Sequence, residues 1–142
     1  MSHIKVGIPY IGGELSKNRS HTRAGYLKPE PRKWCEVLAM LIRTTMSEQD
    51  IGTYSLEPPL DITISGAFRG KPPDIHNLFP LIADCIQDVV GINDQHFRMH
   101  TGRVGKGEPM VFVEITDAKE RAMNEFYDTY QQAGKEEDGA PI

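Results

Sequence analysis

The stretch from Arg69 to Phe97, RGKPPDIHNLFPLIADCIQDVVGINDQHF, predicts the central helix of the fold. Lys71-Pro72-Pro73 favours extended backbone, because proline lacks an N–H donor and biases the residue before it away from helix. A loop therefore precedes Asp74. Apolar residues then recur every three or four positions, which predicts an amphipathic helix from Leu78 to Val90. Gly91 is a residue type that commonly ends a helix.

Pro80 falls within this predicted helix but is compatible with its first turn. If Asn77 is the N-cap, Pro80 occupies the third helical position, where its missing N–H has no partner within the helix anyway. We therefore expect the helix to begin at Leu78, with Asn77 as its cap.

Polar side chains gather at both ends of this helix. Asp74 and His76 precede it, and Asn93 and Asp94 follow it. Carboxylates, an imidazole and amides are ligands that a hard divalent cation such as Mg²⁺ or Mn²⁺ can use. Helix capping by Asp74 and Asn77, with an ordinary turn at Asn93 and Asp94, explains the same residues. The local pattern favours capping and leaves metal binding open.

Several pieces of the sequence together resemble the RusA-type Holliday junction resolvases. PDIHNL at 73–78, Asp84 within the apolar helix and NDQHF at 93–97 are similar to the family's D-x-D-N-L, helical Asp and D-D-x-Q signature. SKNR at 16–19 is similar to the family's S-x-N-R stretch. GKG at 105–107 is similar to the family's final hairpin.

The resemblance covers roughly residues 4 to 117 and implies a small, homodimeric endonuclease that uses Mg²⁺, or Mn²⁺, to cut four-way DNA junctions. It carries Asp74 and Asp94 over as metal-binding catalytic residues, with His76 in the place of a family Asp. The resemblance also implies that Asp84 either binds the metal or supports a ligand without touching the metal itself. The implied chemistry is attack of a metal-activated water on a backbone phosphodiester.

Two residues depart from the family pattern. His76 stands where the family has Asp, and Pro80 stands where it usually has Lys. A neutral imidazole in place of a carboxylate removes one negative charge from the expected metal site. It also replaces a hard oxygen ligand with a softer nitrogen ligand. This motivates an alternative, a weakly active or inactive relative that binds branched DNA without cutting it. A small interaction protein whose polar clusters only cap helices is a third interpretation.

Charge is unevenly distributed along the chain. The net charge is −4, but basic residues outnumber acidic ones in the first third, and the acidic excess follows Val113. The long polar loop from Gly12 to Pro31 is either a solvated surface loop or, as the resemblance implies, a DNA contact. The cations and amides expected to bind DNA are Lys17, Asn18, Arg19, Arg23, Arg69, Lys71, Asn77, Arg103 and Lys106.

Apolar patterning predicts the remaining elements. Strands are expected at 4–11, 60–68, 96–101 and 110–116, with Pro9 near a sheet edge and a Gly-rich turn at 102–108 joining the last two. A helix is expected at 31–46, with Trp34, Met40 and Met46 in the core. Asp117 is expected to cap a C-terminal helix that runs through Gln132.

These elements predict an α/β fold of the α+β type. We expect one RusA-like domain over residues 1–133, with a mixed sheet of about four strands, two core helices and an extra C-terminal helix. Residues 134–142 are expected to form a disordered acidic tail. Cys35 and Cys85 fall on apolar helical stripes, so we expect small buried side chains and no disulfide.

Neither a membrane-spanning run nor a signal peptide is recognisable, so we expect a cytoplasmic protein with no membrane partner. The central helix should be roughly 20 Å long, which places Asp74 and Asp94 at its opposite ends. They can share a metal only if a loop folds back, or if a two-fold dimer sets the helices antiparallel. The second arrangement pairs Asp74 and His76 of one subunit with the second subunit's copy of Asp94.

Overall fold

The computed structural model describes residues 3–15 and 20–138 of the chain. Four strands form one mixed sheet in the order β1-β4-β2-β3: β1 (His3–Pro9), β2 (Leu60–Phe68), β3 (Phe97–Lys106) and β4 (Met110–Thr116). β4 is antiparallel to β1 and β2, whereas β3 is parallel to β2. The predicted α+β class with a mixed sheet is confirmed, and Pro9 does lie at the end of an edge strand.

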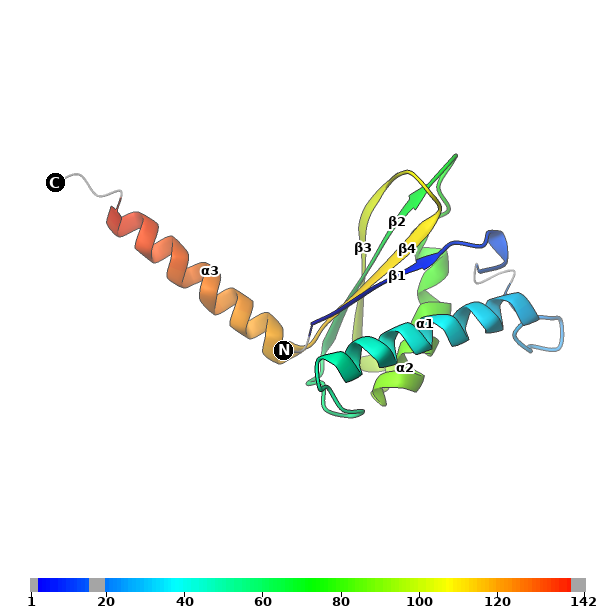
Figure 1. Ribbon diagram of the computed structural model, residues 1–142, viewed down its shortest axis with the longest axis horizontal. Coiled ribbons are helices and arrows are strands. Elements are labelled where there is room, and N and C mark those ends of the chain that lie inside the picture. Colours follow the sequence, from blue (N-terminus) through cyan, green and yellow to red (C-terminus); the bar gives the residue numbers. More distant parts are fainter. Residues whose placement is uncertain (1–2, 16–19, 139–142) are drawn as a thin grey trace.

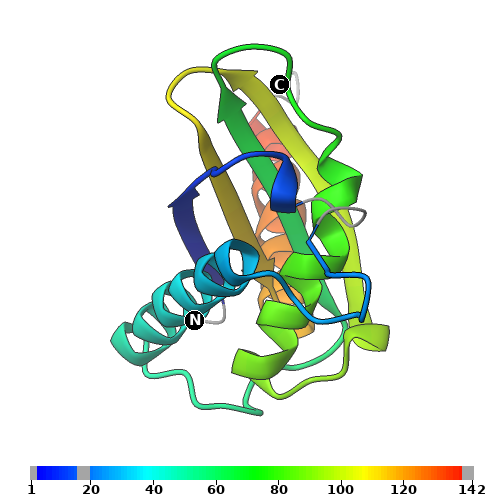
Figure 2. The same ribbon diagram turned by 90° about the vertical axis from the view of Figure 1, so that its right-hand side faces the viewer.

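Two helices, α1 (Pro29–Glu48) and α2 (Phe79–Val90), pack on the same face of this sheet (Figures 1 and 2). Alternate residues of β2 point toward them, and Leu60, Ile62 and Ile64 have no exposed surface. Leu38 of α1 and Ile82 of α2 are equally buried. Burying each such side chain contributes roughly 1.5–3 kcal/mol, so this layer holds the fold together.

The predicted core of α1 is confirmed in part. Trp34 and Met46 are buried, and the Trp34 indole N–H donates a hydrogen bond to the Pro9 carbonyl at 2.7 Å. The expectation for Met40 was wrong, because its side chain is 56% exposed. Six positions beyond Trp34, Met40 has turned away from the sheet on a helix of 3.6 residues per turn.

The connection between β3 and β4 differs from the expected turn at 102–108. β3 continues to Lys106, and β4 does not pair with it, because β2 lies between the two strands. The short link crosses the end of β2, where the Gly107 N–H donates to the Phe68 carbonyl at 3.2 Å. The physical reason is that β2 carries the most buried residues and satisfies its backbone groups by pairing on both sides.

The C-terminal helix α3 (Ala118–Asp138) leaves the sheet on the side opposite α1 and α2 and extends away from the body (Figures 1 and 2). The expected end of this helix at Gln132 was wrong, because α3 continues to Asp138. The disordered acidic tail over residues 134–142 stays a prediction. The sequence KEE at 135–137 consists of good helix formers, which offset the cost of Gly134. Residues 139–142 lie outside the described part of the chain.

Candidate functional site

The start of α2 is organised by Asp74. One turn of 3₁₀ helix, Ile75–Leu78, leads directly into α2, and the Asp74 Oδ1 atom accepts a hydrogen bond from the His76 backbone N–H at 3.0 Å. The prediction that Asn77 caps α2 was wrong. Asn77 lies inside the preceding turn, with its own N–H donating to the Asp74 carbonyl at 3.0 Å. Because the two turns are continuous, α2 needs no side-chain cap, and Pro80 falls in its first turn as expected.

The other end of α2 reverses the chain. Gly91 adopts a left-handed φ of 74°, and its N–H donates to the Gln87 carbonyl at 3.0 Å. The backbone then turns back so that the Asp94 N–H donates to the Gln87 side-chain oxygen at 2.8 Å. Asn93 accepts from the Gln95 N–H at 2.9 Å and caps the short turn Asp94–His96. Asp94 is therefore held against the last turns of α2.

This reversal brings Asp94 near Asp84. Burial raises the pKa of Asp84, and the negative charges of Asp94 and then Asp88 raise it further, whereas His21 opposes the shift. None of the ion pairs formed in the described residues uses Asp84 or Asp94. The two carboxylates repel each other and neither is held in an ion pair among the described residues, a charge pattern suited to a bound cation.

The other two candidate ligands lie at the start of α2. Asp74 and His76 are exposed, and the His76 ring packs on Phe79 with the ring centroids 4.9 Å apart. Within residues 3–15 and 20–138, no group of three or more His, Cys, Asp or Glu side chains is arranged to hold a metal. In the described residues the charge of Asp94 acts on Asp84, whereas Asp74 and His76 form no metal-holding group with them.

A cavity of about 340 Å³ opens between α1 and α2 and is lined in part by Asp84 and Asp88. Its other charged or titratable side chains are His21, Arg32, Glu36 and Arg43, together with two cysteines. Arg32 and Arg43 were not among the site residues predicted from the sequence. Their spacing of three helical turns places both on one face of α1, so helical periodicity could have predicted that they lie together.

The cavity floor contains both cysteines. The pKa of the Cys35 thiol is lowered chiefly because Cys85 hydrogen-bonds to it. The pKa of the Cys85 thiol is raised by the same hydrogen bond and by burial. Both thiols are free in the structure described.

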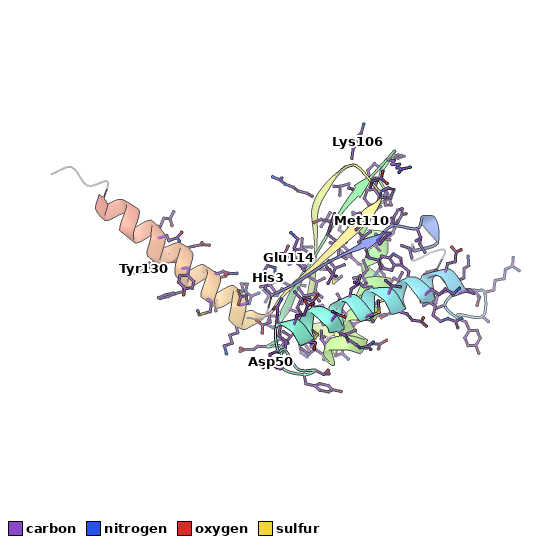
Figure 3. The ribbon with its side chains drawn as sticks, viewed as in Figure 1. His3, Asp50, Lys106, Met110, Glu114 and Tyr130 are labelled. Atoms are coloured by element: carbon purple, nitrogen blue, oxygen red, sulfur yellow. The ribbon has the colours of Figure 1, made fainter. Side chains whose placement is uncertain are left out.

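Basic residues predicted to bind DNA also gather where β2 and β3 end. Lys106 pairs with Phe68 in the sheet register and lies at the tip of the sheet (Figure 3). Arg69 and Lys71 line a cavity of about 360 Å³ beside it. Arg69 is already matched by a carboxylate, because it donates to both oxygens of Glu108 at 2.6 and 2.7 Å.

The remaining predicted DNA contacts are scattered. Arg23 is exposed in the loop before α1, and Arg103 is exposed on β3. Asn77 is half-buried in the turn before α2. Lys17, Asn18 and Arg19 lie outside the described residues. The described cations therefore occupy several sites, of which the α1–α2 cavity and the tip of the sheet are the two best defined.

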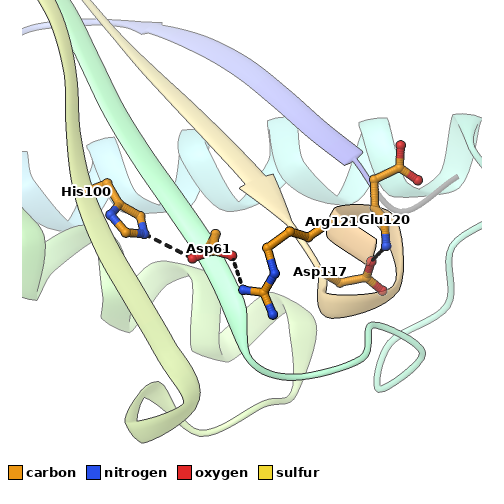
Figure 4. Close-up of polar contacts among 5 residues, drawn as sticks. All are labelled: Asp61, His100, Asp117, Glu120 and Arg121. Carbon is orange, nitrogen blue, oxygen red and sulfur yellow. Dashed lines mark hydrogen bonds and ion pairs between the residues drawn. The ribbon is translucent and has the colours of Figure 1, made fainter. Parts of the chain in front are cut away.

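A polar cluster that sequence analysis missed joins α3 to the sheet (Figure 4). The Asp61 carboxylate is 3.0 Å from His100 Nε2 and accepts from Arg121 Nη1 at 2.5 Å. Burial alone would raise the pKa of Asp61, but the hydrogen bonds from His100 and Arg121 outweigh it and lower the pKa. Asp61 and His100 are cross-strand neighbours whose pairing becomes visible only once β2 and β3 are known to be adjacent.

Comparison with known proteins gives no family assignment: no protein-family model matches the sequence, and no curated protein matches it significantly. No helix in the described residues is both long and apolar enough to cross a membrane.

Proposed function

We propose that this protein is a Mg²⁺-dependent endonuclease that cuts branched DNA, with four-way junctions as its substrate. The observation that carries the proposal is the reversal at Gly91, which sets Asp94 close to Asp84 on α2. Asp84 lines the same cavity as Arg32 and Arg43 and is repelled by Asp94, and this combination of charges suits a hard cation next to a phosphate backbone. The resemblance to the RusA-type resolvases points to the same chemistry.

The donor set fits Mg²⁺ or Mn²⁺. Asp84 and Asp94 would supply carboxylate oxygens, and Asp74 and His76 would complete the ligands from the start of α2. When bound, the metal supplies Lewis acidity that polarises the phosphodiester and lowers the pKa of a water molecule. Arg32 and Arg43 position the DNA backbone beside the carboxylates through charge-assisted hydrogen bonds.

A two-fold dimer supplies the missing ligands in this proposal. Since Asp74 and His76 belong to no three-residue group within the described chain, the second subunit's copies of these residues would face Asp94 across the dimer axis. Two equivalent sites then act on two symmetric strands of a junction. Cutting both strands symmetrically is what resolution of a four-way junction requires.

The first experiment measures cleavage of a synthetic four-way junction and of a linear duplex of the same sequence, with Mg²⁺, with Mn²⁺ and with a chelator. We expect metal-dependent cleavage of the junction only. Asp84→Asn and Asp94→Asn should each lower the rate about 100-fold or more, because each removes a ligand charge. Asp128→Asn, a matched change on exposed α3, should leave the rate unchanged. Equal cleavage by Asp94→Asn and wild type would overturn the assignment.

The second experiment tests sharing between subunits. An Asp74→Asn chain is mixed with an Asp94→Asn chain and the heterodimer is isolated. In the shared arrangement one of its two sites retains both aspartates, so the heterodimer should nick one junction strand although each mutant homodimer is inactive. Complete inactivity of the heterodimer would place both aspartates of a site in the same chain.

A non-cutting DNA-binding protein is the second candidate, and a specific observation favours it. Asp74 already uses one carboxylate oxygen to cap the turn before α2, and His76 replaces the acidic residue of the family pattern. This candidate predicts a salt-dependent mobility shift of the junction with no cleavage in either metal. Absence of a shift at low salt would exclude both candidates and leave an interaction protein whose polar clusters cap helices.

A further inference from the structure

Two thiols from different helices meet in the cavity between α1 and α2. Cys35 of α1 and Cys85 of α2 both line this cavity, and each thiol shifts the pKa of the other. The helices that carry them pack directly against one another in the core. A covalent S–S bond, about 2 Å long, would therefore link two residues that face one cavity from neighbouring helices.

The two cysteines differ in accessibility. Cys35 is half-buried in the cavity wall, whereas Cys85 is only 4% exposed. The cavity volume of about 340 Å³ lies in the range that accepts small organic molecules. A small oxidant can therefore reach Cys35 first, and Cys85 is protected from it but not from Cys35.

We propose that Cys35 and Cys85 are a redox modification site, which a low-molecular-weight disulfide converts into a reversible intramolecular disulfide between α1 and α2. The inference is independent of the proposed nuclease activity. It rests on the packing of α1 against α2, the cavity that the two thiols share and their unequal exposure.

The reaction proceeds in two balanced exchange steps. The Cys35 thiolate attacks one sulfur of an oxidised dithiol such as glutathione disulfide, whose S–S bond breaks and releases one thiolate. The Cys85 thiol then loses its proton and attacks the Cys35 sulfur, which releases the second small thiolate. The two protons from the cysteines pass to the two released thiolates. Overall, two protein thiols are oxidised and one small disulfide is reduced to two thiols.

The protein disulfide would close a long loop. The chain between positions 35 and 85 contains the rest of α1, all of β2 and the first half of α2. A covalent link across such a loop restricts the unfolded chain and stabilises the fold. The oxidised protein should therefore unfold at a higher temperature than the reduced protein.

The test treats reduced, folded full-length protein with glutathione disulfide and follows its intact mass. We expect loss of two hydrogen atoms' mass, no bound glutathione, a monomeric band on a non-reducing denaturing gel and reversal by dithiothreitol. Peptide mapping should join Cys35 to Cys85. The unfolding midpoint should rise by several degrees on oxidation.

Single variants separate the two roles. Cys85→Ala should retain one glutathione on Cys35, because no second thiol can displace it. Cys35→Ala should remain unmodified while folded, because Cys85 is buried, and should react once unfolded in denaturant. Neither variant should gain stability from the treatment. The proposal is overturned if wild type retains a glutathione adduct, forms a disulfide between chains, or stays unmodified while the denatured chain reacts.

Discussion

At the scale of single residues, Asp61 shows how one carboxylate can join two elements. It belongs to β2, yet its oxygens contact His100 of β3 and Arg121 of α3 (Figure 4). Both partners are hydrogen-bond donors to the ionised form, which is why the pKa of Asp61 is lowered despite its burial. The ionised state of Asp61 is thus linked to the folded position of α3.

This linkage predicts a pH-dependent contribution to stability. Because the folded-state pKa of Asp61 lies below its unfolded value, the stabilisation is present above the ordinary carboxyl pKa and is lost as pH falls through the folded pKa. Asp61→Asn should lower the free energy of unfolding at neutral pH by roughly 1 kcal/mol. Urea unfolding of both proteins from neutral to acidic pH measures the difference. If it stays constant across that range, the linkage is absent.

Gly91 is the residue on which the position of Asp94 depends. Its φ of 74° disfavours any side chain, and an added Cβ would contact the Tyr54 ring. Gly91→Ala should therefore lower the free energy of unfolding by roughly 1–2 kcal/mol through backbone strain. Displacement of Tyr54 should lower it further. Thermal or urea unfolding measures this change.

The matched control is Gly105→Ala, where an added Cβ meets nothing within 4 Å. The free energy of unfolding of Gly105→Ala should differ from that of wild type by less than about 0.5 kcal/mol. Equal effects of the two changes would show that the reversal after α2 tolerates a side chain. Hydrogen exchange at the Asp94 amide in Gly91→Ala then reports whether the turn still holds.

At the scale of elements, α3 is anchored at one end only. Asp117, 1% exposed, accepts from the Glu57 N–H at 3.0 Å and from the Glu120 N–H at 2.9 Å. The large apolar side chains Met123, Phe126, Tyr127 and Tyr130 are exposed, and Tyr130 projects from the helix well away from the sheet (Figure 3). The first turn therefore determines where the whole helix points.

Removal of this anchor has a defined cost. Asp117→Ala should lower the free energy of unfolding by roughly 1–2 kcal/mol, since it removes a helix cap and leaves the Glu57 N–H without its acceptor. Asp128→Ala, on the exposed part of α3, should change stability by less than about 0.5 kcal/mol. Chemical unfolding of both variants provides the comparison. A similar effect of the two substitutions would mean that the cap contributes no more than a surface carboxylate.

At the scale of the whole molecule, local sequence patterns predicted where the helices and strands lie along the chain. They did not predict which strands lie next to each other in the sheet. Alternating apolar residues gave β2 with its observed bounds, and the apolar stripe gave α2 to within one residue. The glycines at 105 and 107 indicated a turn but not that β2 would lie between the strands it connects. Strand order depends on contacts between distant residues, which no short pattern contains.

The candidate site was predictable to a similar extent. The family resemblance singled out Asp74, Asp84 and Asp94, but the return of Asp94 to α2 depends on a left-handed Gly91 and on a bond to Gln87. That bond joins a backbone amide to a side chain seven residues earlier, which periodicity does not reveal. The metal, the DNA substrate and the dimer remain predictions for the experiments above.

The place of β4 between β1 and β2 affects how the chain reaches its native state. β1 begins at His3 and pairs with a strand that ends at Thr116, so the sheet closes only when nearly the whole domain has been synthesised. Such high contact order favours slow folding. A released chain truncated after residue 109 should therefore remain sensitive to protease, whereas one truncated after residue 121 should become resistant. During synthesis, the fold is completed only when β4 becomes available to pair with β1 and β2.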